Sequence, residues 1–407
     1  MLKKGLIYFL LFASYSCTCQ TLDSCERQFT NNNLLLIAGH FNIDISRAAV
    51  IQAKIWDLPY LSTEINAFNP SANRVFDAGA QGQKTLAIQQ LILIGNKRKN
   101  EIAFNNSNVE IAELQFEDIL RNLRFELRQN FYEIYFEQKK LAFTDTTLAN
   151  LDSLITTYRI QAGKGNLPLK DLVRLQSLYF SIKNDRNAIV LSILEAQEKL
   201  KIIRGLNTDV RPVVSLSKLS CFKNPVRQLN TDSLIEQALA SRPDYLAAIK
   251  QSESGQWMLK LQKSLAVPNV TLGASYDQRG GAFNNQVNLT LGVPLPLWNR
   301  NKGNIMMAQA RNNQYLVGES MSKNEIINEV NKNYSKWKEA SDNYGQYVLS
   351  KYESFDKIYL GIITNFRKKN INIMEFTDFM ESYNLSMQQI NDINKKLVIA
   401  SEELNTT

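Results

Sequence analysis

The sequence predicts a mainly helical protein in which long antiparallel helical hairpins form an α-barrel and membrane strands form a β-barrel. Three observations predict this fold class. The chain is an internal duplication, its helical patterns are much longer than a globular core needs, and each copy carries one hairpin of alternating apolar and polar residues. Only 17 glycines and 9 prolines interrupt the 407 residues, which also favours long elements.

The duplication is visible as identical residues at nearly constant spacing. At an offset of 209, Asp23, Ser24, Lys54 and Pro59 match Asp232, Ser233, Lys263 and Pro268; at 203, Asn96 and Ile102 match Asn299 and Ile305; at 204, Asn166 and Leu200 match Asn370 and Leu404. The fall from 209 to 203 places about six extra residues in the hairpin of the first copy. We therefore expect a first repeat over 20–205, a linker over 206–230 and a second repeat over 231–407.

Residues 1–19 have the pattern of an export signal. Lys3 and Lys4 precede an apolar stretch, and small and polar residues follow up to Cys19. Cleavage there predicts a mature chain that starts near Gln20, and lipidation of Cys17 or Cys19 is an alternative fate. Cys25 and Cys221 then either pair or remain isolated thiols, and the narrow range of Cα separations in disulfides favours isolated thiols.

Three helices are expected in each repeat. The first covers residues 22–56 and 232–266, where an Asp-Ser pair signals the start and a proline follows the end. The second covers 97–161 and 300–368, and at 1.5 Å per residue such a helix is about 100 Å long. After turns at 162–166 and 366–370, a return helix runs to Arg204 or Leu404. The first and the return helix together nearly equal the long helix, so they fit end to end beside it.

One β-hairpin is expected in each repeat, over residues 58–95 and 268–298. In the second hairpin, apolar residues alternate with polar or small ones at Val270, Leu272, Ala274 and Tyr276 and again at Val287, Leu289, Leu291, Val293, Leu295 and Leu297. About ten alternating residues match what a tilted strand needs to cross a bilayer. A half-buried hairpin of a soluble sandwich is the alternative, but no other strand-rich region would cover its apolar face.

Four strands per chain cannot close a barrel in lipid, because open edges leave backbone groups unpaired. Three chains would supply twelve strands and an interior wide enough for solvent. No segment after the export signal has 18 consecutive apolar residues, so strands rather than helices are expected to cross a membrane.

These features together resemble the TolC-type outer-membrane efflux proteins over the whole mature chain. The resemblance lies in the duplicated order of elements and in three segments: VPLPLWNRNKGNI at 293–305, GNLPLKDL at 165–172 and NINIMEFTD at 370–378. It implies a homotrimer with its barrel in outer-membrane lipid and its helices in the periplasm, where they meet an adaptor (membrane fusion) protein and an inner-membrane pump of the RND type. The second tip also resembles members associated with cobalt, zinc and cadmium export.

The resemblance also implies a channel gate at the periplasmic tip. Glu375 and Asp378 match the paired gate acids of the family, and Asp171 matches the corresponding acid of the first copy. Gly163, Gly165, Asn166 and Asn370 fall in the tip turns that would contact the adaptor. Three-fold repetition would bring six carboxylates toward one axis and favour cations. Helix capping is the alternative role, with Asn372 and Glu375 forming a capping box, and for Asp171 it is the favoured one.

Other functional classes lack a matching pattern. We find no nucleophile with a base, no phosphate loop and no cofactor or metal motif, so an enzyme is not expected. His40, the only histidine, is expected to pack or face solvent. The net charge of +8 is scattered among acids, which argues against nucleic acid. The alternatives to a passive metal-efflux duct are a duct for drugs or type I secretion and a non-channel helical scaffold of the envelope.

Overall fold

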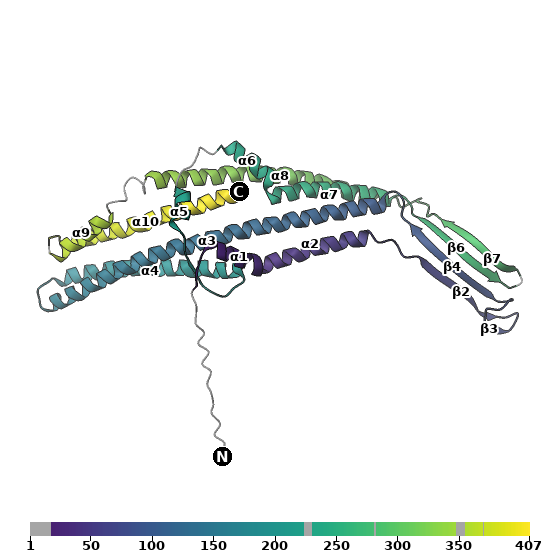
Figure 1. The fold of residues 1–407 in the computed structure, drawn as a ribbon, viewed down its shortest axis with the longest axis horizontal. Coiled ribbons are helices and arrows are strands. Elements are labelled where there is room, and N and C mark those ends of the chain that lie inside the picture. The colour runs from purple at the N-terminus through teal and green to yellow at the C-terminus, as the bar shows by residue number, and fades with distance from the viewer. Residues whose placement is uncertain (1–17, 224–229, 281, 347–354, 369) are drawn as a thin grey trace, which may run out of the picture. The chain divides into compact units, whose positions relative to one another are not determined.

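A computed structural model describes residues 18–223, 230–280, 282–346, 355–368 and 370–407 (Figure 1). The helices are α1 Leu22–Asn32, α2 Leu34–Ala53, α3 Lys97–Gly163, α4 Leu169–Arg204, α5 Leu216–Lys223, α6 Thr231–Ser241, α7 Pro243–Leu265, α8 Lys302–Tyr344, α9 Phe355–Arg367 and α10 Ile373–Thr406. The strands are β1 Thr18–Gln20, β2 Tyr60–Asn69, β3 Arg74–Asp77, β4 Gln83–Ile92, β5 Val210–Pro212, β6 Val270–Arg279 and β7 Phe283–Gly292. The predicted order of helix, hairpin, long helix and return helix is present in both halves of the chain.

The chain forms two compact units, and each contains segments from both halves. The helical unit comprises the described residues of 1–37, 119–238 and 326–407, and the sheet unit comprises those of 38–118 and 239–325. Residues 1–17 of the predicted export signal lie outside the described residues, as do 347–354 in the predicted second long helix.

The main sheet joins the two hairpins edge to edge. Its order is β3-β2-β4-β6-β7, and all neighbours are antiparallel. The two hairpins meet where β4 pairs with β6, from Gln83 opposite Arg279 to Ile92 opposite Val270. Ten-residue strands at β2, β4, β6 and β7 confirm the predicted hairpins.

Two details of the hairpins were predicted wrongly. The extra residues of the first hairpin include an unpredicted strand, β3, where the buried Asp77 carboxylate accepts hydrogen bonds from Asn69 Nδ2 at 2.9 Å and Gly79 N at 3.1 Å. The last strand ends at Gly292 instead of reaching 297. Pro294 and Pro296 lack the N–H groups that strand pairing requires.

The prediction of an unbroken first helix in each repeat was also wrong. Both helices break, at Asn33 and at Arg242, which are 209 residues apart, and both break residues have extended backbone. Asn33 is buried; its Oδ1 accepts from Leu36 N at 3.0 Å and its Nδ2 donates to the Ile203 carbonyl at 2.7 Å. Arg242 precedes Pro243, which disfavours helical backbone at the residue before it.

The predicted linker over 206–230 carries two short elements, β5 and α5. Strand β5 pairs in parallel with β1, with Thr18 opposite Val210 and Gln20 opposite Pro212. The end of α4 is tied to the same region, because the buried Arg204 donates to Gln20 Oε1 at 3.0 Å and to Gln28 Oε1 at 2.9 Å. These contacts fix the junction of the first repeat and its linker within the helical unit.

In the part of the chain that the structure describes, α2 is the one helix that could cross a membrane by length and composition. The expectation that no helix after the signal crosses a membrane was based on a different criterion, a run of 18 consecutive apolar residues. Its sequence contains Asn42, Asp44 and Arg47, so it is not a continuous apolar run.

Candidate functional site at the helix tips

The two turns that join long and return helices have the same construction. Asn166 donates from its backbone N to the Gln161 carbonyl at 2.9 Å and from Nδ2 to Gln161 Oε1 at 2.8 Å. Asn370 repeats this pair with the Asn365 carbonyl at 2.9 Å and with Asn365 Oδ1 at 3.1 Å. Gly165 has a φ of 76°, which favours glycine. The match between Asn166 and Asn370 at an offset of 204 therefore reflects one shared turn.

The residues predicted to contact an adaptor are all at the surface. Gly163, Gly165, Asn166 and Asn370 are exposed. Apart from neighbours in sequence, no heavy atom of the described residues lies within 4 Å of the place where a Cβ would stand on Gly163 or Gly165. The turns thus present backbone and short side chains that a partner surface could approach closely.

Two of the predicted gate acids lie at the start of α10 and are exposed. Glu375 forms the predicted capping box: its backbone N donates to Asn372 Oδ1 at 2.9 Å, and its Oε2 accepts from Asn372 N at 3.3 Å. Asp378 follows one turn later. The capping role of Glu375 is therefore confirmed, and it holds this carboxylate at the positive end of the helix.

The third acid, Asp171, lies in the first turn of α4 and is half-buried. The residue at the N-cap is Pro168, which makes no side-chain cap, so Asp171 supplies the negative charge at this helix start. Burial raises the pKa of Tyr158, and the nearby Asp171 carboxylate raises it further. The structure thus brings Asp171 close to an aromatic side chain of α3.

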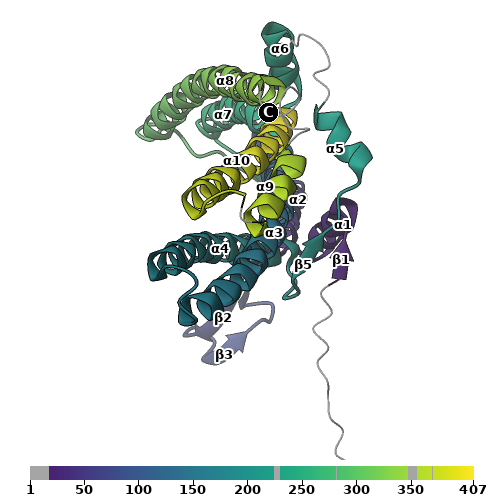
Figure 2. The ribbon, with the colours of Figure 1, turned by 90° about the vertical axis from the view of Figure 1, so that its left-hand side faces the viewer.

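Aromatic rings pack directly behind the tips. Phe366 of α9 stacks on Phe376 of α10 with ring centroids 3.9 Å apart and on Tyr158 of α3 at 5.7 Å. They belong to an apolar cluster that also contains Leu151, Leu175 and Met380. The α3–α4 and α9–α10 pairs lie side by side in both views (Figure 1, Figure 2). The sequence analysis did not identify this stack, although apolar residues in both tip segments were a signal for it.

Further along the helical unit, the interface between α3 and α10 is ionic. Lys395 Nζ lies 2.8 Å from Glu133 Oε1 and 2.7 Å from Glu137 Oε1, and Lys140 Nζ lies 2.8 Å from Asp392 Oδ1. Burial lowers the pKa of Lys395, but hydrogen bonds to Glu133 and Glu137 outweigh it and raise the pKa overall. We call these five residues the charged seam. The sequence analysis missed it because its partners are more than 250 residues apart.

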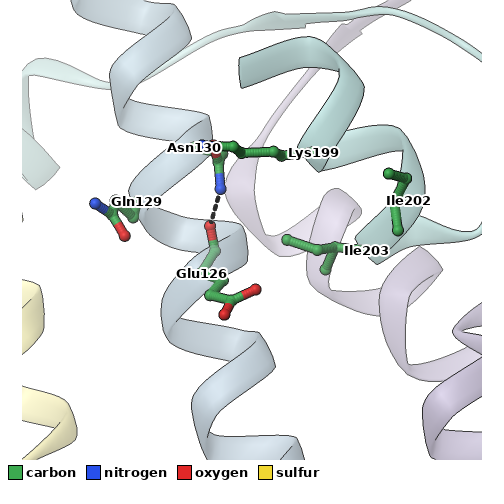
Figure 3. A pocket seen from close by; sticks show the side chains of 6 residues that line it. All are labelled: Glu126, Gln129, Asn130, Lys199, Ile202 and Ile203. Atoms are coloured by element: carbon green, nitrogen blue, oxygen red, sulfur yellow. Dashed lines mark hydrogen bonds between the residues drawn. The ribbon is translucent and has the colours of Figure 1, made fainter. Parts of the chain in front are cut away.

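A shallow groove of mixed polar and apolar lining lies between α3 and α4 (Figure 3). Its volume is about 370 Å³, and it is lined by Glu126, Gln129, Asn130, Lys199, Ile202 and Ile203. Asn130 Nδ2 donates to the Glu126 carbonyl at 2.7 Å, so this amide serves the helix itself. Within the described residues, no group of three or more His, Cys, Asp and Glu side chains could hold a metal ion.

Three further residues considered in the sequence analysis are His40, Cys25 and Cys221. His40 is exposed and packs against Phe116, with ring centroids 4.3 Å apart. Cys25 is buried and Cys221 is exposed, and both thiols are free. These positions agree with packing and isolated-thiol roles.

Comparison with known proteins supports the predicted resemblance. The model of the family described as "Outer membrane efflux protein" matches residues 234–405. The second repeat thus matches the outer membrane efflux family, and the chain as a whole resembles that family. The predicted resemblance is thereby confirmed for the second repeat, and the predicted fold class is confirmed for the chain.

Sequence and fold relatives agree with this family. The cobalt-zinc-cadmium resistance protein CzcC of Cupriavidus metallidurans is 20% identical over 290 residues, which cover 71% of this chain and 66%, slightly under two thirds, of CzcC. Solved relatives include CusC, with a TM-score of 0.74 at 16% identity, covering 95% of this chain and 91% of CusC. The outer membrane channel CmeC of Campylobacter jejuni has a TM-score of 0.75 at 12% identity, covering 95% and 84%. The open MtrE channel of Neisseria gonorrhoeae has a TM-score of 0.73 at 14% identity, covering 95% and 88%.

Proposed function

We propose that three copies of this efflux protein form one passive conduit across the outer membrane. The observation that carries this proposal is the sheet, which ends at β3 on one side and at β7 on the other and is therefore open. Apolar residues that alternate along its strands are exposed, with Leu61 65% and Leu289 86% exposed. Open strand edges are unfavourable in lipid, and three copies would contribute twelve long strands to a closed ring.

We further propose that the conduit works with an adaptor and an inner-membrane pump, as the resemblance implies. The exposed turns at Gly163, Gly165, Asn166 and Asn370 support a contact surface at the periplasmic end. A passive duct needs an energy source elsewhere, which an inner-membrane pump of the RND type would supply. The name of CzcC supports divalent metal cations as the substrate class.

Glu375 and Asp378 are the gate acids in this proposal, and Asp171 has a supporting role behind them. Glu375 and Asp378 are both exposed at the start of α10, and the capping box holds Glu375 in place. In a ring of three copies they would supply six carboxylates, which attract cations and repel one another. The positions Asp171 and Arg174 correspond to them in the first repeat, so the acidic pair exists in one repeat only.

The gate is tested by the reversal potential of the Glu375→Gln/Asp378→Asn variant in a salt gradient across a planar bilayer. Glutamine still caps the helix, so the variant removes charge while it keeps the capping box. We expect the preference for cations over anions to fall and the resting conductance to change. Glu198→Gln, which neutralises an exposed acid of α4, is the matched control and should leave both unchanged. An unaltered reversal potential in the double variant would remove these acids from the gate.

A further inference from the structure

Four segments of the sheet unit, each of which joins a helix to a strand, carry an excess of positive charge. They cover residues 54–60, 93–103, 257–269 and 293–304, and we call them the junction segments. Their acids are Asp57 and Glu101, and their cations are Lys54, Lys97, Arg98, Lys99, Lys260, Lys263, Arg300 and Lys302. On the opposite side of the sheet, residues 64–84 and 277–286 contain three cations and three acids. Within the sheet, the excess of positive charge is therefore confined to the end that meets the helices.

Hydrogen bonds hold the four junction segments together. They connect the end of α2 to the start of α3, the start of α3 to the end of α7, and the end of α7 to the start of α8. The donors and acceptors are Arg98 with the Lys54 carbonyl, Lys97 Nζ with the Val267 carbonyl, and Asn301 Nδ2 with the Gln262 carbonyl. The cations of all four segments thus gather at one end of the sheet, where α2, α3, α7 and α8 meet the strands (Figure 1).

The cations of the junction segments have no acid to neutralise them. Among the residues that the structure describes, none of the eight forms an ion pair with a carboxylate. Other cations of the same helices do, since Arg47 of α2 lies 2.7 Å from Glu113 and Lys250 of α7 lies 2.7 Å from Glu110. Lys97 is buried and donates to oxygens of the α7–β6 connection, so it serves the fold. The other seven cations are exposed or half-buried and are available to an anion.

Several of these cations also stand where a helix disfavours positive charge. Lys97, Arg98 and Lys99 begin α3, while Arg300 and Lys302 flank the start of α8, and neither helix has an acid in its first turn. The start of a helix carries partial positive charge, which favours anions and disfavours cations. Helices α4, α7 and α10 follow this rule, because each has an acid in its first turn. An external anion therefore explains the cations of α3 and α8 better than helix stability does.

Large apolar side chains are exposed beside these cations. Trp56 is 61% and Trp298 is 92% exposed, and Leu295 and Leu297 are exposed as well. The guanidinium of Arg98 lies over the Trp56 ring, 4.3 Å from its centroid. The Nε of Arg98 is buried and has no hydrogen-bond partner among the described residues. Tryptophan next to arginine and lysine is typical of the level at which lipid headgroups meet water.

We infer that the junction segments bind anionic phospholipid, with the headgroup phosphate at the cations and the acyl chains along the exposed apolar side chains. Guanidinium and ammonium groups donate charge-assisted hydrogen bonds to phosphate oxygens, and clustered cations attract an anionic lipid surface. A zwitterionic lipid carries its own ammonium group, which opposes this attraction. The inference rests on the proposed conduit in a membrane and deepens it by naming the lipid class at the helix end of the sheet.

Native mass spectrometry of the purified full-length protein tests this inference by titration with phosphatidylglycerol or with phosphatidylcholine of the same acyl chains. We expect tighter binding of phosphatidylglycerol. The variant Lys99→Gln/Lys302→Gln removes two exposed cations from the starts of α3 and α8. Its affinity for phosphatidylglycerol should fall about thirtyfold, or about fivefold for each cation, with little change for phosphatidylcholine. Its Tm should not fall, because both cations oppose the helix dipole.

The matched control is Lys183→Gln/Lys199→Gln, which removes the same charge from exposed positions of α4 and should keep the affinity of the wild type. Equal affinity of the wild type for the two lipids, or an equal loss in both double variants, would overturn the inference. Displacement of phosphatidylglycerol by inorganic phosphate would also overturn it, since that result would indicate an anion site without a role for the acyl chains.

Reconstitution into phosphatidylcholine vesicles separates failure of the lipid surface from failure of the conduit. Protein that inserts into these vesicles and conducts ions, but shows no preference for phosphatidylglycerol, would overturn the inferred lipid surface and leave the proposed conduit standing. Folded protein that inserts into vesicles of neither lipid would overturn both.

Discussion

Lys395 shows how much a single side chain contributes to the helical unit. Its ammonium lies between Glu133 and Glu137, and Glu137 is buried with Lys140 as its other cation. Burial of an unpaired charged group is strongly unfavourable, so the stability of the charged seam depends on each of its five residues. The seam also joins α3 of one repeat to α10 of the other.

Replacement of Lys395 by methionine should destabilise the protein strongly. The variant leaves two acids facing each other without their shared cation, and the loss of one partner of a buried pair costs about 3 kcal/mol. Thermal unfolding of the purified protein, followed by circular dichroism, measures the effect as a lower Tm. Lys199→Met, which removes an exposed lysine of α4, should change the Tm little. The double variant Lys395→Met/Glu137→Gln should recover part of the loss, and its failure to do so would contradict the seam.

The two free thiols should differ in reactivity. Burial raises the pKa of Cys25 from 9.0 to about 11, and nearby Arg204 opposes this shift only in part. Because the folded-state pKa is raised, the neutral thiol is favoured and its contribution to stability is complete below pH 9 and lost as the pH rises toward 11. Alkylation at pH 8 with peptide mapping should modify Cys221 and leave Cys25 unmodified until the chain is denatured. Equal labelling of both thiols in the native protein would show that Cys25 is accessible.

At the scale of elements, the helices and strands that follow from the spacing of apolar residues were predicted correctly. The long helices and the alternating strands follow from residue spacing alone, and so does the capping box at Asn372. The helix breaks at Asn33 and Arg242 were missed because the apolar pattern continues across them, while a tertiary hydrogen bond to Ile203 and the proline after Arg242 determine the break.

Features that depend on partners distant in the chain were not predictable from spacing. Lys395 and Glu133 are 262 residues apart, and nothing local marks them as a pair. The tip acids could be located at the starts of return helices, because capping signals are local. Their surroundings, including the electrostatic effect of Asp171 on the pKa of Tyr158, depend on the packing of α3 against α4.

The aromatic stack should determine how firmly the α9–α10 tip is held. Phe376 is completely buried and stacks on Phe366, so Phe376→Ala would leave a cavity that costs about 3 to 4 kcal/mol. Hydrogen exchange should become faster in the turn around Asn370 and in the first turns of α10. Phe180→Ala, at an exposed position of α4, is the control and should leave exchange at the tip unchanged. Unchanged protection in the Phe376 variant would mean that the stack does not stabilise the tip.

At the scale of the whole molecule, duplication explains why one chain contains only part of the structure. Its sheet has edge strands at β3 and β7, and apolar side chains such as Leu61 and Leu289 are exposed on it. A single chain therefore leaves the edges of its sheet unpaired. The proposed ring of three copies would pair the edges of the sheet, and the acids of the second tip would then repeat three times around its axis.

Conductance of the purified protein in a planar bilayer tests this account most directly. We expect discrete current steps that prefer cations, because the proposed ring encloses a solvent-filled interior with acids at its narrow end. Folded protein that leaves the bilayer sealed at every voltage would contradict a conduit.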